Sequence, residues 1–350
     1  MKKIQYSKRI DRQIRNAIDV FQLDLTDLTV MTEAASGAFV TTSIIAAMAG
    51  ARVLAFTRDS SYGQAVEICD YVNSWASQLG LLKKIHVLVK PPAGFASEVD
   101  IVTNLGFVRP ISSELIYALP PHAVISLMWE PWEFRPGDID LYACKNAQIP
   151  VIGTRETDSR LNTFRHVGTL ALKLLLERNI EIFGSKIVLI GSNPFESAVY
   201  KALTSLGASV TRIKNVGKID DLDLIYGRAV DRADALVLVE HRIDRELIGF
   251  RGGIHPARIK GNNVELIHIC GQINNKALID YDIFKWPIKE APFGYMTVTT
   301  DYIGPLPVID LHCAGLRVGG VASRVRKAGG SLGEAVEAAE ATGLGVRLDL

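Results

Sequence analysis

Short apolar runs alternate with stretches of helical periodicity along the first half of the chain. The apolar runs read LTVMT, RVLAFT, KIHVLV, DIVTN, AVISLM and IPVIGT, and helical patterns fall between them at 41–49, 65–79 and 113–119. Strands that read as continuous apolar runs are typical of a parallel sheet that helices cover on both faces. The pattern therefore predicts a doubly wound α/β domain.

A long helical pattern, 163–179, separates this half from a second series of strands. That series starts with a strand, Gly191, a helix and a further strand, all within 186–213, and continues with apolar runs at 234–241 and 264–273. We expect two Rossmann-like doubly wound parallel-sheet domains with a cleft between them. Their expected bounds are 1–157 plus 305–350 for the first and 158–304 for the second. A capped helix is predicted between Ser331 and Gly343.

Composition and charge narrow the class of protein. The chain has 350 residues, of which 48% are hydrophobic, and 39 Lys and Arg stand against 38 Asp and Glu, for a net charge of +1. No global field is available to hold nucleic acid or an anionic membrane, so neither partner is expected. The four cysteines are far apart and show no metal-ligand spacing. We expect reduced thiols, no bound metal and a cytoplasmic location.

Between Glu114 and Ala322 the order of elements resembles the D-2-hydroxyacid dehydrogenase and formate dehydrogenase family, with the S-adenosylhomocysteine hydrolases as structural cousins. The segments that carry the likeness are ELIYALPPHAVISLM, DIDLYACKNAQIPVIGT, the helix from Thr163, the Gly191 turn and NNVELIHICGQINNKALID. The resemblance implies NAD or NADP against the second domain, a small-molecule substrate in the cleft, and a homodimer that pairs through the second domain.

The residues that carry the family's chemistry are missing at the matching positions. The Arg that holds the substrate carboxylate falls on Cys270, and the His that exchanges the hydroxyl proton falls on or near Asp301. A thiol cannot hold a carboxylate by two hydrogen bonds. Proton transfer is therefore expected to fall to Glu130, Glu133 or Asp301.

The turn after the strand at Lys186 departs from the dinucleotide-binding pattern G-x-G-x-x-G. Gly191 is kept, but Asn193 and Glu196 stand at the other two glycine positions, and a carboxylate there would repel phosphates. The next strand ends in Arg212 and Lys214, which either suit a 2′-phosphate or are solvated surface cations. The cofactor-binding candidates are Gly191, Ser192, Asn193, Pro194, Arg212, Lys214 and His241.

Polar side chains also follow the strands of the first domain, at the edge where open α/β sheets bind their ligands. They lie in TEAASGAF, FTRDSSYG, TNLGFVRPI, LMWEPWEFRPGDID and GTRETD. Each segment also has a structural interpretation, as a turn, a helix cap or an ion pair. The substrate-binding candidates are Glu33, Ser36, Arg58, Arg109, Arg135 and Thr154. His268 and His312 are expected to be structural.

These observations leave three hypotheses open. The leading one is an NAD(P)-binding oxidoreductase-like enzyme that acts on a small polar metabolite with a non-standard catalytic set. The second is a lyase, transferase or hydrolase that uses no nicotinamide and works in the first domain. The third is a catalytically silent ligand-binding or scaffold protein.

Overall fold

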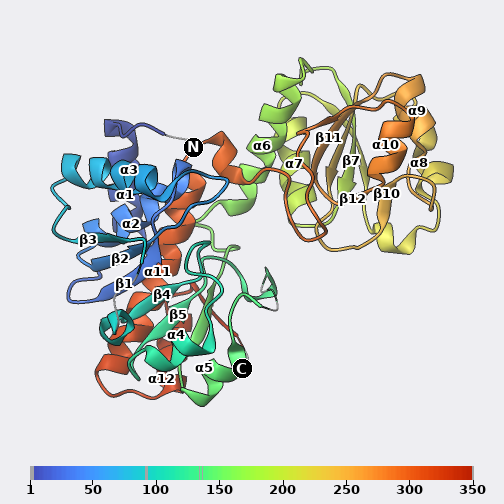
Figure 1. Ribbon diagram of the computed structural model, residues 1–350. Helices are drawn as coiled ribbons and strands as arrows, with labels where there is room; N and C mark the ends of the chain where they lie inside the picture. The colour runs from blue at the N-terminus through green and yellow to red at the C-terminus, as the bar shows by residue number, and fades with distance from the viewer. Residues whose placement is uncertain (1–3, 91–93, 134, 136, 349–350) are drawn as a thin grey trace. The chain divides into compact units, whose positions relative to one another are not determined.

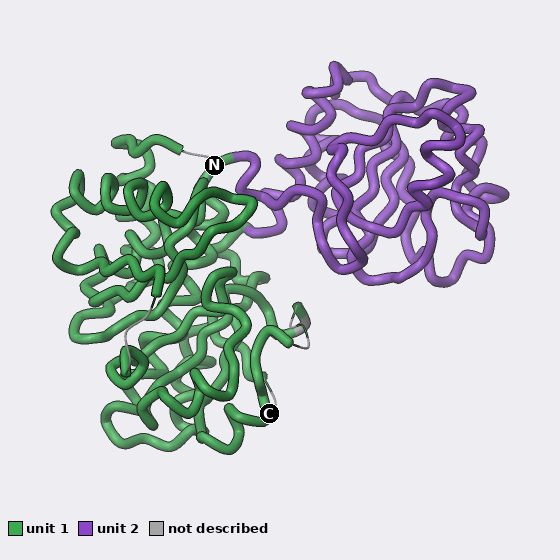
Figure 2. The backbone as a smooth tube through the Cα atoms, viewed as in Figure 1, with its two compact units in different colours: residues 1–162, 304–350 green, residues 163–303 purple. Residues whose placement is uncertain are grey.

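The computed structural model describes residues 4–90, 94–133, 135 and 137–348 (Figure 1). The chain divides into two compact units, which Figure 2 distinguishes by colour. Unit 1 consists of Met1–Asn162 with Gly304–Leu350, and unit 2 consists of Thr163–Ile303.

Unit 1 is built on a seven-stranded sheet with the order β14-β6-β5-β4-β1-β2-β3. Its strands pair in parallel, except that β14 is antiparallel to β6. The strands are β1 (Thr29–Glu33), β2 (Arg52–Phe56), β3 (Ile85–Leu88), β4 (Ile101–Thr103), β5 (Val124–Ser126), β6 (Val151–Thr154) and β14 (Gly345–Arg347).

Alternate strand residues of this sheet face two separate hydrophobic cores. Val30 and Ile101 pack in one core, and their neighbours Met31 and Val102 pack in the other. The first core contains residues of α1 (Lys8–Val20), α2 (Val40–Met48), α3 (Ala65–Gln78), α11 (Leu306–Lys327) and α12 (Leu332–Ala341). The second contains residues of η2 (Phe95–Glu98), α4 (Ser113–Ala118) and α5 (Leu141–Asn146). Unit 1 is therefore doubly wound, as the apolar runs predict.

Helix α11 crosses the face of the sheet that packs in the first core, and it begins near the carboxyl ends of the strands. A Cβ on Gly315 would lie 2.5 Å from Met128 Cε, just past β5, so the helix packs closely there. Ser126 Oγ donates a hydrogen bond of 2.6 Å to the Gly315 carbonyl. Later in the helix, Arg326 donates to the carbonyl of Pro121, which precedes β5. The first turns of α11 therefore lie at the carboxyl edge of the sheet.

Unit 2 holds a second parallel sheet with the order β13-β11-β9-β7-β8 and a small parallel pair, β10 and β12. The strands are β7 (Lys186–Gly191), β8 (Ser209–Ile213), β9 (Ala235–Val239), β10 (Glu246–Ile248), β11 (Glu265–Cys270), β12 (Gln272–Ile273) and β13 (Lys285–Trp286). The helices are α6 (Thr163–Glu177), α7 (Phe195–Ser205), η4 (Val216–Lys218), α8 (Leu222–Val230), α9 (Pro256–Gly261), α10 (Asn275–Asp280) and η5 (Thr300–Ile303).

Two local features differ from the sequence predictions. The run 264–273 forms two strands in different sheets, because Gly271, with a φ of +117°, turns the chain between β11 and β12. The antiparallel strand β14 also escaped prediction, since three residues are too short to show a period. The helix expected after Ser331 is present as α12, and Ser331 and Glu334 form its capping box.

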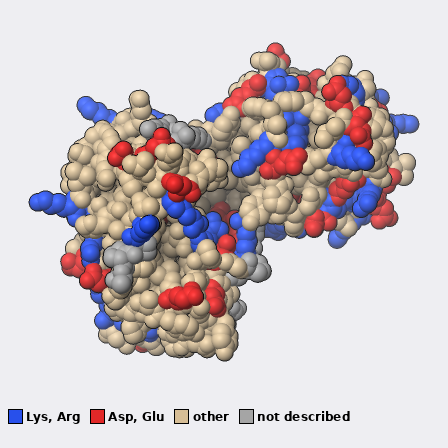
Figure 3. Space-filling view, viewed as in Figure 1, with Lys and Arg blue, Asp and Glu red and all other residues tan. Residues whose placement is uncertain are grey.

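The surface charge of unit 2 and the length of the helices bear on possible nucleic-acid and membrane partners. On the face of unit 2 seen in Figure 3, basic and acidic side chains are interspersed. Within the described residues, no helix has the length and apolar character needed to cross a membrane.

Candidate functional site

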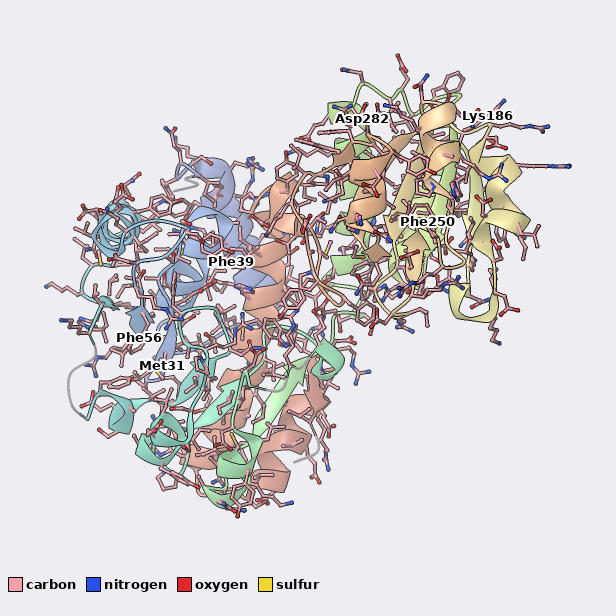
Figure 4. All side chains as sticks on the ribbon, turned by 45° about the vertical axis from the view of Figure 1, so that its right-hand side comes forward. Met31, Phe39, Phe56, Lys186, Phe250 and Asp282 are labelled. Atoms are coloured by element: carbon pink, nitrogen blue, oxygen red, sulfur yellow. The ribbon has the colours of Figure 1, made fainter. Side chains whose placement is uncertain are left out.

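The strand order of unit 1 reverses between β1 and β4. From β1 the chain proceeds through β2 and β3 on one side, whereas β4, β5 and β6 follow on the other. In open α/β sheets, ligands bind at the carboxyl edge where this reversal occurs. Glu33 ends β1 and Asn104 follows β4, so these two residues mark the place. In Figure 4, the labelled Met31 and Phe56 locate β1 and β2 of this sheet.

Glu33 is a buried carboxyl group with raised proton affinity. Its side chain is 6% exposed, and Oε2 accepts a hydrogen bond of 3.3 Å from the Phe107 N–H. Burial raises the pKa of Glu33 to about 7, against the opposing effects of the Phe107 and Gly106 N–H groups and of Arg109. A carboxyl group with this pKa can release and take up a proton near neutral pH.

Two contacts hold the side chain of Arg109, whose positive charge opposes the rise in the pKa of Glu33. Its Nη1 donates to Asp138 Oδ2 at 3.0 Å, and its guanidinium carbon lies 5.0 Å from the centre of the Trp129 ring. The ion pair and the ring contact together fix the plane of the guanidinium group. We use the name Glu33 site for Glu33, Asn104, Arg109 and Trp129.

Three nitrogen donors of the Glu33 site are buried without an acceptor among the described residues. They are Asn104 Nδ2, Arg109 Nε and Trp129 Nε1. Asn104 is only 1% exposed, and its Oδ1 accepts a 2.8 Å hydrogen bond from the Met128 N–H. A buried donor without a partner is costly and calls for an explanation, of which a ligand is one.

A second group of carboxyl groups, the glutamate cluster of Glu130, Glu133 and Glu156, follows β5 and β6. Glu133 and Glu156 share a side-chain hydrogen bond, and Glu130 Oε1 accepts from the Glu156 N–H at 2.9 Å. Burial and the neighbouring carboxyl group raise the pKa of Glu156 well above its ordinary range. Burial also raises the pKa of Glu133, while Arg135 opposes that rise. A proton shared by the two side chains would remove the repulsion between them.

Close packing brings the members of this cluster together. A Cβ on Gly153 would lie 2.5 Å from Pro131 Cδ, so the glycine lets η3 (Pro131–Glu133) rest on β6. The Thr154 N–H also donates to the Trp129 carbonyl at 2.9 Å. Sequence reasoning singled out Glu130 and Glu133 as acids but gave Glu156 no catalytic role, because its pairing depends on this contact between two loops.

The other substrate-binding candidates of unit 1 have varied surroundings. Thr154 is buried, and its hydroxyl donates to the Leu127 carbonyl at 2.7 Å within the sheet. Arg58 is exposed, with its guanidinium carbon 5.7 Å from the centre of the Phe107 ring. Ser36 is half-buried and precedes η1 (Gly37–Phe39), but its side chain forms no cap hydrogen bond.

Burial shifts the pKa values of two polar side chains in helix α11. Burial raises the pKa of Asp310, in the second turn of α11, to about 7. His312 Nδ1 and Thr42 Oγ1 form a hydrogen bond of 2.6 Å, and burial lowers the pKa of His312 to about 3. Phe39 lies beside α11 (Figure 4), with its ring centre 5.7 Å from that of His312. His312 is thus a neutral packing residue.

The strand order of unit 2 reverses between β7 and β9, and the Gly191 turn lies there. A Cβ on Gly191 would approach Val239 Cγ2 to 2.5 Å, so this glycine serves the packing of the two strands. Ser192 Oγ donates to Glu240 Oε2 at 2.7 Å, across the ends of β7 and β9. Glu240 is 0% exposed, and its Oε1 accepts from the N–H groups of Arg242 and Ile243 at 2.8 and 3.0 Å.

Aromatic and charged side chains fill the remaining positions of this turn. Phe195, at the start of α7, stacks on His241 with ring centres 4.3 Å apart. Glu196 is 0% exposed, and both of its oxygens accept from Arg212, with Oε2 also 3.8 Å from Lys214 Nζ. The two cations at the end of β8 therefore neutralise Glu196. The hydroxyl of Ser197 donates to Asn193 Oδ1.

The two positions that match the family's catalytic residues carry no comparable chemistry. Cys270 is buried at the end of β11, where burial raises the pKa of its thiol. Asp301 lies in η5 and accepts a hydrogen bond from Thr299. His268, as expected, is buried, and burial lowers its pKa to about 4. Among the described residues, no group of His, Cys, Asp and Glu side chains could hold a metal ion.

The chain is similar to several solved structures. A dipicolinate synthase subunit from Bacillus halodurans is 9% identical and matches 83% of this chain and 96% of its own, with a TM-score of 0.51. A dipicolinate synthase subunit from Bacillus subtilis is 11% identical over 88% and 99% of the two chains, with a TM-score of 0.48. NAD-dependent formate dehydrogenase from Staphylococcus aureus is 10% identical over 83% and 93%, with a TM-score of 0.45.

The likeness to the dipicolinate synthase of Bacillus halodurans confirms the fold class, two Rossmann-like α/β domains. At 9% identity, this likeness shows the fold and nothing finer. A scan against protein-family models and a search of curated proteins found no match. The fold alone leaves the reaction to be argued from the side chains.

The residues at the Gly191 turn do not fit the pyrophosphate of a dinucleotide. A glycine-rich turn admits the pyrophosphate because nothing but backbone N–H groups faces it. Here the stacked rings of Phe195 and His241 lie at the start of α7. The oxygens of Glu240, at the end of β9, are acceptors like those of a phosphate. Neutralisation of Glu196 removes one source of repulsion and leaves these two obstacles in place.

Proposed function

We propose that the protein is an enzyme that transfers a proton to or from a small polar metabolite at the Glu33 site of unit 1. The observation that supports this most strongly is the position of Glu33. It is a buried carboxyl group with a pKa raised to about 7, at the place where the strand order of the sheet reverses. A general acid or base is most effective when its pKa lies near the working pH.

The neighbouring groups suit this role. The charge of Arg109 acts on Glu33, and Asp138 and Trp129 orient its guanidinium group, so Arg109 is a candidate to bind a polar group of the substrate. The glutamate cluster, at the ends of the next two strands, offers further carboxyl groups with raised pKa values. These features favour a lyase, transferase or hydrolase reaction by acid–base catalysis, the second of the three sequence hypotheses.

NAD(P)-dependent hydride transfer, the leading sequence hypothesis, has the two-domain fold in its favour but finds no support at the Gly191 turn. The side chains of Phe195, Glu240 and His241 argue against a dinucleotide in its usual position. We therefore assign no step to a nicotinamide.

The proposal is tested by incubating the protein with an extract of small metabolites and following their amounts by mass spectrometry. The natural protein should convert at least one polar metabolite, and Glu33→Gln should slow that conversion at least about a hundredfold, the usual effect of losing a general acid or base. The amide oxygen of glutamine can still accept from the Phe107 N–H, so the variant should fold. Glu337→Gln, on an exposed face of α12, is the matched control. Equal conversion by both variants would refute the proposal.

A further inference from the structure

We propose that Gly106 is a positioning residue for the acid–base group Glu33. Because it has no side chain, it lets the turn at 105–109 close on one carboxyl oxygen, Oε2, and this leaves Oε1 as the oxygen that exchanges the proton with the substrate. This inference rests on the proposed function and adds to it the residue that sets the geometry of proton transfer.

Residues 105–109 follow β4 and form a single tight turn. The Leu105 carbonyl accepts hydrogen bonds from the N–H groups of Val108 and Arg109, at 3.0 and 3.1 Å. As at the start of a helix, the first N–H groups of such a turn have no carbonyl of the turn itself to bind. One of them, the Phe107 N–H, donates to Glu33 Oε2 at 3.3 Å. The turn therefore presents a backbone donor to a buried acid.

Gly106 allows the turn to approach Glu33 this closely. A Cβ added to Gly106 would lie 3.1 Å from Glu33 Oε2, which is tighter than an ordinary van der Waals contact. Among the described residues beyond its chain neighbours, no other atom would lie within 4 Å of that Cβ. The φ of Gly106 is outside the left-handed region, so alanine can adopt this backbone. A side chain here would therefore act on Glu33 and on little else.

Other contacts hold the turn, so the carboxyl group would have to yield to a side chain at position 106. The Arg58 guanidinium carbon lies 5.7 Å from the centre of the Phe107 ring, and Arg58 Nη2 donates to the Arg109 carbonyl at 3.5 Å. The Arg109 side chain donates to Asp138 at 3.0 Å. Glu33 itself is 6% exposed, and a buried side chain has little room to move without losing contacts.

The turn also determines which carboxyl oxygen carries the proton. A backbone N–H donates a hydrogen bond and cannot accept one, so a proton on Oε2 would face another donor. The protonated form of Glu33 therefore carries its proton on Oε1. In the ionised form, the N–H groups of Phe107 and Gly106 and the charge of Arg109 favour the carboxylate, and they limit the rise in the pKa of Glu33 that burial causes.

The first test uses the natural protein and NMR. Phenylalanine labelled with nitrogen-15 reports on 12 backbone N–H groups, and the Phe107 signal is assigned by its disappearance in Phe107→Leu. This signal should shift with pH at the same midpoint as the carbon-13 signal of the Glu33 carboxyl group, and Glu33→Gln should abolish the shift. A Phe107 signal that does not follow Glu33 would overturn the inference.

The second test is Gly106→Ala. The added methyl group should displace Oε2 from the Phe107 N–H, so the titration midpoint of Glu33 should rise by about half a unit or more. The pH of half-maximal conversion of the metabolite should rise by the same amount, and turnover should fall about fivefold or more with little change in KM. Gly333→Ala in α12 is the matched control, because an added Cβ there meets no described atom nearer than 3.9 Å.

The two proposals can fail separately. If Gly106→Ala leaves the midpoint and the turnover unchanged, the inference is overturned and Glu33 remains the acid–base group. If the variant loses activity and melts at a lower temperature while the Glu33 midpoint stays in place, Gly106 has a structural role only, and the inference is again overturned. A midpoint near 4.5 for Glu33 in the natural protein would instead overturn the proposed function, and this inference with it.

Discussion

Arg212 donates hydrogen bonds to both carboxylate oxygens of Glu196, so a residue at the end of β8 neutralises a buried acid in the first turn of α7. In a glycine-rich dinucleotide turn these two positions serve the cofactor, the first through the helix start and the second through the ribose. In this protein the two side chains bind each other instead. The guanidinium carbon of Arg212 also lies 3.9 Å from the centre of the Tyr200 ring, which fixes it further.

This pair predicts a large and non-additive effect on stability. Arg212→Ala leaves Glu196 buried with Lys214 as its remaining cation among the described residues, so the free energy of unfolding should fall by about 2–4 kcal/mol. The double variant Glu196→Leu/Arg212→Ala should lose less than Arg212→Ala alone, because no buried charge remains. Chemical denaturation of the four proteins in the cycle measures this. Additive losses would show that the two side chains do not depend on each other.

The Gly191 turn predicts weak or absent dinucleotide binding. Calorimetric titration with NAD and with NADP should give no heat of binding for the natural protein, because side chains lie where the pyrophosphate would pass. Lys214→Ala should leave this result unchanged. Tight binding of either dinucleotide would contradict our account of the turn and restore hydride transfer as the leading function. In that case, a preference for NADP that Lys214→Ala removes would assign the 2′-phosphate to this strand end.

Glu33 predicts a distinctive pH dependence of stability. Its pKa is raised from 4.5 to about 7 in the folded protein, so the folded state binds this proton more tightly than the unfolded state does. The stability that this preference contributes is fully present below about pH 4.5 and is lost as the pH rises through about 7. At about 1.4 kcal/mol for each tenfold change in affinity, the loss is about 3 kcal/mol.

The variant Glu33→Gln isolates this effect from the other acids. Its free energy of unfolding should not show the loss between about pH 4.5 and pH 7, so the natural protein should become the less stable of the two at high pH. Denaturation at several pH values provides the comparison. Parallel stability curves for the two proteins would mean that Glu33 titrates in its ordinary range.

The glutamate cluster predicts a stabilising substitution. Since burial and mutual repulsion raise the pKa of Glu156 well above its usual range, the folded state loses stability as the pair gives up its proton on raising the pH. Glu156→Gln can keep a hydrogen bond to Glu133 without that proton. Its melting temperature should exceed that of the natural protein at pH 8 and differ little at pH 5. A lower melting temperature at both values would contradict the shared proton.

The sequence predicted the architecture well, because burial on both faces of a sheet leaves a clear signal. The apolar runs placed β1 to β6 and the main strands of unit 2, and the glycine at position 191 marked the turn after β7. The predictions were wrong at 264–273, where Gly271 divides the run into two strands. The short edge strand β14 was missed.

The site was harder to predict from the sequence, because its chemistry depends on contacts between segments that are far apart in the chain. The raised pKa of Glu33 follows from burial beneath the segment that carries Gly106 and Phe107, which no local pattern reveals. The pairing of Glu133 with Glu156 likewise needs the close approach of Pro131 to Gly153. One signal was present and unused: Glu196 at the start of the helix and Arg212 near the end of the following strand have opposite charges.

The central claim, that Glu33 is an acid–base group poised near neutral pH, can be measured without knowing the substrate. The protein is labelled with carbon-13 at the side-chain carboxyl of glutamate, the Glu33 signal is assigned by its disappearance in Glu33→Gln, and its chemical shift is followed against pH by NMR. Our account predicts a titration midpoint near 7, because burial outweighs the two N–H donors and Arg109. A midpoint near 4.5, the ordinary value for glutamate, would contradict it.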